Sequence, residues 1–100
     1  MKVEQMENTR GNKVDNQFII RDGEKIVFQS YNSLIVEADF SKKAITIGPD
    51  YNYSTTTGKY RNLFFTDYVY FPNLNTLKGL ESALKEGSFG VWTIKRGIIQ

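Results

Sequence analysis

The sequence contains no cysteine and no histidine, and these two absences restrict its chemistry more than any residue that is present. Without cysteine there is no disulfide, no thiolate nucleophile and no zinc site built on sulfur. Without histidine the chain lacks the commonest general base and the commonest zinc ligand. Together these absences predict a protein that is not an enzyme and that carries no metal or other cofactor.

Long apolar stretches and strong charge are also missing. No run of about 20 apolar residues occurs, which predicts that no helix spans a membrane. Residues 1–16 are polar and lack the apolar core of a signal peptide, which predicts a cytoplasmic protein. The formal net charge is only +2, which is too small by itself to indicate a nucleic-acid-binding domain.

The remaining composition is that of an ordinary folded protein. Hydrophobic residues make up 40% of the chain and charged residues 24%, as in globular domains. Residues 1–16 show no hydrophobic periodicity, and we expect them to form a flexible N-terminal tail. A length of 100 residues suits one domain, which we expect to span residues 17–100.

Four segments alternate between apolar and polar residues, as strands do. The link Asp22-Gly23 is a typical hairpin turn, and the other links are equally short. Four neighbouring strands with short links predict an antiparallel meander with one covered face. The predicted strands are residues 17–21, 25–30, 33–40 and 44–48.

A helix is predicted to follow the meander. Ser54 or a neighbouring threonine is a suitable N-cap, because its hydroxyl can accept a hydrogen bond from a free backbone N–H. Beyond it, Tyr60, Leu63 and Phe64 are spaced as on one face of a helix that ends near Thr66.

A second helix and a last strand complete the predicted order. Residues 76–86 carry an apolar stripe, with Asn73 or Asn75 as the expected N-cap and Gly87 as the expected end. Residues 89–96 alternate again and predict a strand. The predicted order is ββββ-α-α-β, an α+β fold with an antiparallel sheet of four to five strands and two helices.

Residues 51–61 are the most unusual segment, because tyrosines, consecutive hydroxyl residues and two cations are concentrated there. In one interpretation the hydroxyls cap a helix and the tyrosines pack at the edge of the sheet. In the other the segment is a recognition surface, since tyrosine and arginine often dominate the energy of protein interfaces. The candidate binding residues are Tyr31, Tyr51, Tyr53, Thr55, Lys59 and Arg61.

Two other functions are compatible with parts of the sequence, and a third is excluded. Basic residues between tyrosines can bind single-stranded nucleic acid. Residues 42–61 have this composition, and Lys95 would extend the surface that they form. Its lysines outside the tyrosine-rich segment are Lys42, Lys43 and Lys95. Glu37 and Asp39 share one face of a predicted strand, as paired catalytic carboxylates or a solvated face would.

The third of these functions, a phosphate-binding loop, is excluded. Gly58-Lys59 resembles the end of such a loop, but Tyr53 stands where the first glycine is required. Tyr60 stands where the loop needs a serine or threonine, so the magnesium ligand is missing as well.

The unusual segment also resembles a known family. Tyr51, Tyr53-Ser54, Thr56-Thr57, Lys59-Tyr60 and Phe64 are similar to a Y-x-Y-S-x-T-T-x-K-Y-x-x-x-F signature. That signature is found in small uncharacterised proteins of phages and other mobile elements in Gram-positive bacteria. Residues 28–35 resemble an F-x-S-Y-N-x-x-I stretch of the same family, so the likeness covers about residues 18–65.

The resemblance implies a gene context but no established activity. An accessory protein of this kind would act in the cytoplasm of a bacterial host by binding a host protein. Inhibition of a host defence nuclease, as by an anti-CRISPR protein, is favoured by analogy alone. We therefore expect a non-enzymatic binding protein, either a monomer or a homodimer paired through an exposed sheet edge.

Overall fold

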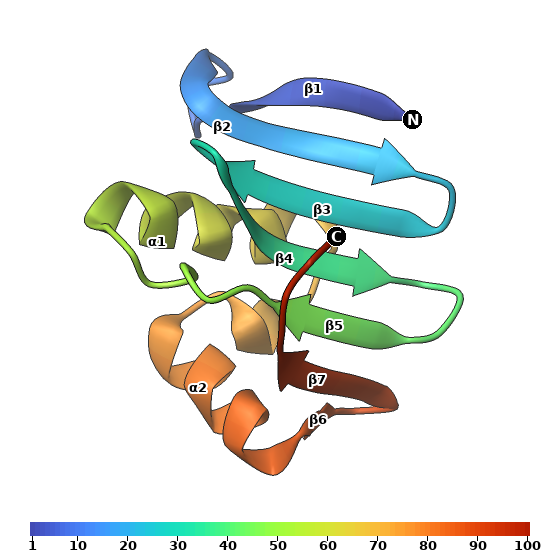
Figure 1. The fold of residues 1–100 in the computed structure, drawn as a ribbon. Helices are drawn as coiled ribbons and strands as arrows, with labels where there is room; N and C mark the ends of the chain where they lie inside the picture. Colours follow the sequence, from blue (N-terminus) through green and yellow to red (C-terminus); the bar gives the residue numbers. More distant parts are fainter.

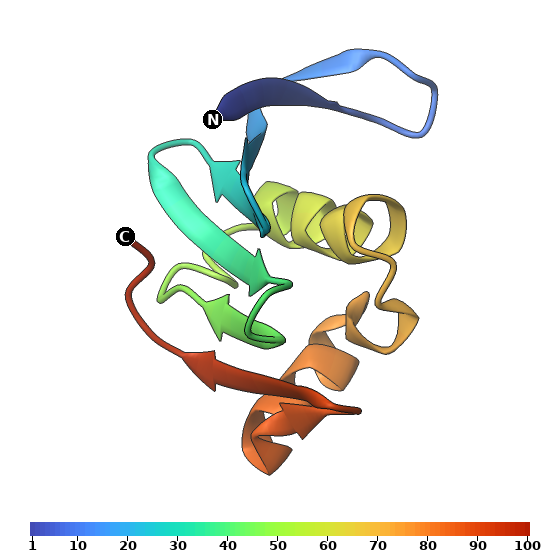
Figure 2. The ribbon, with the colours of Figure 1, turned by 90° about the vertical axis from the view of Figure 1, so that its right-hand side faces the viewer.

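One mixed sheet and two α-helices make up the computed structural model, which describes residues 1–100. The seven-stranded sheet has the order β1-β2-β3-β4-β5-β7-β6. Both helices lie against one face of the sheet, and the C-terminal segment crosses in front of the other face (Figure 1, Figure 2). The strands are β1 (Lys2–Glu7), β2 (Lys13–Asp22), β3 (Lys25–Ser30), β4 (Ser33–Asp39), β5 (Ala44–Ile47), β6 (Ser88–Phe89) and β7 (Trp92–Arg96).

The antiparallel meander predicted from the sequence is present as β2 to β5. Each of these strands pairs antiparallel with the next, and the α+β class is confirmed. Ile19, Phe28, Val36 and Ile47 stand opposite one another across the four strands, and each is 0% exposed. The period-2 pattern therefore places one apolar row under the helices, where it forms the centre of the core.

The prediction of a flexible tail is not what the structure shows for residues 1–16. Residues 2–7 form β1, which pairs antiparallel with β2, and Met6 is fully buried. The loop between these strands is closed by Asn8, whose Oδ1 accepts hydrogen bonds from the backbone N–H groups of Arg10 and Asn12. The loop is thus held by an asparagine side chain and not by a two-residue glycine turn. Because such a turn is the usual sequence signal of a hairpin, this hairpin was not predicted.

The predicted antiparallel sheet of four to five strands understates the sheet, which has seven strands and one parallel pair. β7 pairs parallel with β5, and β6 forms a short hairpin with β7. The helical segment between β5 and β7 acts as a crossover connection, which is the link that parallel neighbours require. The sheet is therefore mixed, and the end of β7 lies beside the end of β5.

The two α-helices begin at hydroxyl caps. Helix α1 (Thr55–Leu63) has Ser54 as its N-cap, as predicted, and the Ser54 Oγ accepts from the Thr57 N–H at 3.1 Å. Helix α2 (Leu77–Glu86) is capped by Thr76 rather than by either predicted asparagine, and it ends at Gly87 with φ 77°. Neither is long and apolar enough to cross a membrane.

Two shorter helical turns join α1 to α2. The π-helix η1 (Phe64–Tyr68) continues α1 past the end predicted near Thr66, and the 3₁₀-helix η2 (Pro72–Leu74) follows. The wide π turn buries both Phe64 and Phe65, whose ring centroids lie 5.6 Å apart.

A second aromatic cluster packs at the β6 end of the sheet. The Trp92 ring meets Phe40 edge-on with centroids 5.0 Å apart, and Phe71 at 4.9 Å. Phe89 extends the cluster from β6, with its centroid 5.4 Å from that of Phe71. These half-buried rings hold the β6–β7 hairpin against the end of β4.

Candidate functional site

The hydroxyl residues of the 51–61 segment divide into two groups. Thr57 is 0% exposed, and its Oγ1 lies 2.9 Å from the Oγ of Ser30 on β3. Ser54 donates to the same Thr57 oxygen at 3.2 Å, so these hydroxyls hold the first turn of α1 against the sheet. Thr55 and Thr56 are exposed. The capping interpretation therefore describes Ser54 and Thr57, and leaves the other two hydroxyls on the surface.

Arg61, predicted as a surface contact, is a core residue that is only 1% exposed. Its Nη1 donates to the backbone carbonyl of Tyr51 at 2.6 Å, and its Nη2 donates to Asn62 Oδ1 at 3.0 Å. Burial lowers the pKa of the guanidinium, while nearby Tyr51 and Glu81 oppose that shift. The arginine therefore ties the loop before α1 to the helix and is not available to a partner.

Tyr51 joins that loop to helix α2 and strand β7. Its hydroxyl donates to Glu81 Oε2 at 2.8 Å and accepts from Arg96 Nη2 at 3.2 Å. The Arg96 guanidinium also lies 5.4 Å from the centroid of the Tyr51 ring, within cation–π range. The hydrogen bond to Glu81 and partial burial raise the pKa of Tyr51, so the phenol stays protonated at neutral pH and acts as a donor.

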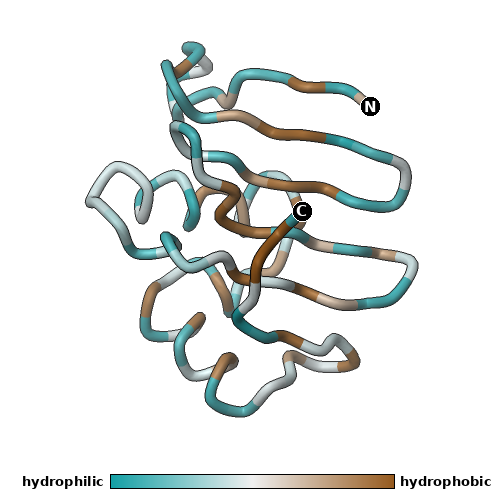
Figure 3. Tube along the Cα trace, viewed as in Figure 1, coloured by the Kyte–Doolittle hydropathy of each residue, from teal (hydrophilic) through white to brown (hydrophobic).

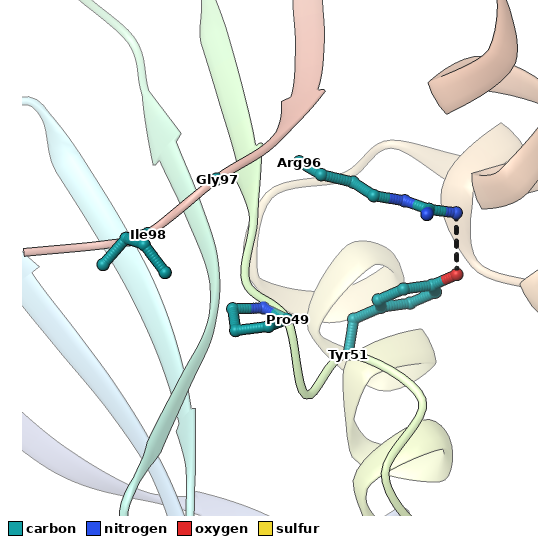
Figure 4. A pocket seen from close by; sticks show the side chains of 5 residues that line it. All are labelled: Pro49, Tyr51, Arg96, Gly97 and Ile98. Atoms are coloured by element: carbon teal, nitrogen blue, oxygen red, sulfur yellow. Dashed lines mark hydrogen bonds between the residues drawn. The ribbon is translucent and has the colours of Figure 1, made fainter.

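A shallow pocket lies beside this tyrosine (Figure 4). Figure 4 shows the Arg96 side chain running alongside the Tyr51 ring, with Pro49 between that ring and Ile98. A second hollow lies next to it at Leu34, and Pro49 and Ile98 line both. We call these two adjacent hollows the Tyr51 groove, defined by Leu34, Pro49, Tyr51, Arg96 and Ile98.

The C-terminal segment forms one wall of the Tyr51 groove. Its position is fixed at Gly97, whose N–H donates to the carbonyl of Ile47 at 3.0 Å. The segment is strongly apolar where it crosses β4 (Figure 3). Ile98 nevertheless remains 73% exposed, so the groove presents apolar surface to solvent beside the Arg96 guanidinium.

Two of the predicted binding residues are exposed near this groove. Tyr53 is 71% exposed in the loop that carries Tyr51. Tyr31 is 44% exposed in the β3–β4 turn. That turn is held to the same loop by the hydrogen bond that Ser33 Oγ donates to Asp50 Oδ2 at 2.7 Å. The structure thus gathers Tyr31, Tyr51 and Tyr53 on neighbouring loops.

The predicted basic residues are not gathered there. Lys42 and Lys43 lie in the β4–β5 turn, before β5, whereas the tyrosine loop follows the other end of that strand (Figure 1). Lys95 stands opposite Thr46 on β7. Lys59 is exposed on α1, with its Nζ 5.4 Å from the centroid of the Tyr60 ring. The lysines and the tyrosines therefore do not form one basic-aromatic surface.

The carboxylate of Asp39 accepts hydrogen bonds from the turn that follows it. Its Oδ1 accepts hydrogen bonds from the Ser41 hydroxyl at 2.7 Å, the Ser41 N–H at 3.0 Å and the Lys42 N–H at 3.2 Å. The Ser41 hydroxyl bond, together with both backbone bonds and nearby Lys25, lowers the pKa of Asp39 although burial opposes the shift. Nowhere do three acidic side chains come together as a metal site would need.

Asp39 is expected to make folding stability sensitive to acid. A carboxyl with a lowered pKa in the folded state stabilises the fold above its ordinary pKa, and that contribution is lost as the pH falls through the lowered value. Asp39→Asn should therefore have a lower melting temperature than wild type at neutral pH. At about pH 2 the difference in melting temperature should be smaller. Thermal melts at both pH values measure this. An equal difference at both would contradict it.

Several residues of the Tyr51 groove were not predicted from the sequence. Arg96 and Ile98 are far from Tyr51 in the chain and reach it only because β7 pairs with β5. Glu81 reaches the tyrosine from α2. The one available signal was the apolar pair Ile98-Ile99, which follows the charged strand end after a single glycine and is unusual for an exposed segment.

Comparison with known protein families assigns this chain to one family. Residues 1–76 match a family of unknown function, DUF8033, and the chain belongs to that family. The matched region contains Tyr51 and the whole of α1, and it ends before Arg96 and Ile98. Neither the curated proteins nor the solved structures include a match to this chain.

Proposed function

We propose that this member of the DUF8033 family is a non-enzymatic accessory protein of phage or mobile-element type, which binds a protein of its bacterial host through the Tyr51 groove. One observation supports this most directly. Two apolar side chains, a tyrosine and an arginine that lacks a carboxylate partner line one exposed hollow. The only ion pair of the chain lies elsewhere, between Arg21 and Glu4.

The groove chemistry defines the partner that it would bind. The Arg96 guanidinium carries donors beyond the one shared with Tyr51, and a carboxylate is their best acceptor. Pro49 and Ile98 offer apolar contact beside it. Tyrosine and arginine are enriched where interfaces gain most of their energy. The partner segment would therefore present an aspartate or glutamate next to an apolar side chain, and a host defence nuclease is favoured by analogy with phage accessory proteins alone.

Binding is expected to depend on Arg96 and not on net charge. The tagged protein is used to capture partners from a Gram-positive host lysate, and the same capture is repeated with Arg96→Glu. Lys13→Glu makes the same charge change at an exposed residue of β2. A true partner should bind wild type and Lys13→Glu equally, and its purified form should bind Arg96→Glu at least about tenfold more weakly. Loss with both variants, or with neither, would contradict the proposal.

Single-stranded nucleic acid is the second candidate partner. The Thr93 N–H donates to the Lys43 carbonyl at 2.9 Å, so the β4–β5 turn and β7 bring Lys42, Lys43 and Lys95 to one region of the sheet. Binding there would release counterions and fall steeply with salt. A filter-binding titration of a mixed-sequence single strand distinguishes the two candidates, since a log–log slope near zero removes nucleic acid.

A further inference from the structure

Strand β1 is an open edge of the sheet. It is the outermost strand on its side, and nothing lies beyond it (Figure 1, Figure 2). It has 6 residues, whereas the opposite edge strand, β6, has only 2. An edge strand of this length presents a row of unpaired backbone N–H and C=O groups that can pair with another strand.

The first half of β1 lacks a proline and a bulge, although it carries two charged residues, Lys2 and Glu4, of the kind that usually discourages such pairing. The bulge of the strand lies between Gln5 and Glu7, so Lys2 to Gln5 pair regularly with β2. The other end is occupied, because the Glu7 N–H donates to the Tyr68 hydroxyl at 3.4 Å. The open stretch is therefore centred near Val3.

Symmetry limits how two copies of β1 can pair. In an antiparallel pair, directly opposite residues point to the same face of the sheet. In a pair with two-fold symmetry, one residue must consequently face its own copy. A pair centred on Lys2 or on Glu4 would place like charges opposite each other, which is unfavourable. A pair centred on Gln5 would run into the bulge.

The pair centred on Val3 is the complementary one. It places Lys2 of each copy opposite Glu4 of the other, and it brings the two Val3 side chains, each 55% exposed, together. Glu4 already accepts from Arg21 Nε at 2.8 Å through one carboxylate oxygen, which leaves the other for the lysine of the second copy. Opposite charges directly across strands are stabilising.

We propose that β1 is a homodimerisation edge, at which two copies pair antiparallel about Val3 and form one continuous sheet. The partner is a second copy of this chain, selected by the crossed Lys2 and Glu4 charges. This edge is separate from the Tyr51 groove, which opens at β4, β5 and β7. Each protomer of the dimer would thus keep its groove free.

Exchange of the two charges tests this proposal sharply. Lys2→Glu places acids opposite each other, and Glu4→Lys places lysines opposite each other, so each variant alone should dimerise at least about tenfold more weakly than wild type. Mixed in equal amounts, the two variants should form a heterodimer, because both crossed pairs then have opposite charges. Analytical ultracentrifugation over a range of protein concentrations measures all three samples.

Two controls separate pairing from folding and from net charge. Lys78→Glu changes the net charge as Lys2→Glu does but lies at an exposed position of α2, so it should dimerise as wild type. The double variant with Lys2→Glu and Glu4→Lys restores complementarity and should also dimerise as wild type, even if one single variant unfolds. A monomeric wild type at all concentrations, or single variants that dimerise normally, would overturn the proposal.

Discussion

Arg61→Ala is expected to lower the free energy of unfolding by about 3 kcal/mol. The substitution leaves a cavity where a side chain that is 1% exposed had been, and it removes the donor to the Tyr51 carbonyl. A drop of this size corresponds to a decrease in Tm of about 15 °C for a domain of this length. Urea unfolding followed by circular dichroism measures the change.

Arg61→Met separates the two contributions. Methionine fills most of the volume but cannot donate to the Tyr51 carbonyl, so this variant should lose only about 1 kcal/mol. It also removes a buried cation that has no carboxylate partner, which reduces the loss further. Arg10→Ala, at an exposed loop position, should change stability by less than about 0.5 kcal/mol. An Arg61→Ala protein as stable as Arg10→Ala would contradict the structural role of Arg61.

The role of Arg61 also affects how groove variants are interpreted. Arg61 positions Tyr51 through its backbone, so an Arg61 variant would weaken binding and stability together. Arg96 is exposed and contacts Tyr51 only at its ring and hydroxyl. Loss of binding without loss of stability is therefore expected at Arg96 alone, and it distinguishes contact with a partner from support of the loop.

Local signals explain which parts of the fold could be predicted. The β2 to β5 meander follows from alternation and short turns, and the capped start of α1 follows from Ser54. Each of these depends on residues that are neighbours in the sequence. The same is true of Gly87, which adopts φ 77° at the end of α2 because a residue without Cβ tolerates that conformation.

Contacts between distant segments explain what could not be predicted. Arginine is usually a surface residue, and nothing near Arg61 in the sequence indicates that it is buried. Its burial depends on the backbone carbonyl of Tyr51 in the preceding loop, which accepts its hydrogen bond. Gln17 on β2 is likewise 0% exposed, although glutamine side chains usually lie on the surface. The parallel pairing of β7 with β5 leaves no periodic signal, yet it brings Arg96 to Tyr51 and so creates the groove.

Gly79→Ala is expected to destabilise the protein by about 2 kcal/mol, although alanine is the better helix former. A Cβ at this position would overlap the backbone carbonyl oxygen of Asn73 and lie 3.1 Å from Thr76 Oγ1. That hydroxyl is the N-cap of α2 and accepts from the Gly79 N–H itself. The clash is with backbone, which cannot rotate away as a side chain does, so it outweighs a propensity gain of about 1 kcal/mol.

Gly58→Ala is the matched control, because Gly58 lies in the first half of α1 as Gly79 does in α2. Its added Cβ would meet only the Arg61 guanidinium, at 3.7 Å, which is an ordinary contact distance. Helix propensity then determines the sign, and this variant should gain up to about 1 kcal/mol. Chemical denaturation of the two variants should therefore shift in opposite directions from wild type. A shift of both in the stabilising direction would show that η2 and α2 are not packed as closely as the Asn73–Gly79 contact requires.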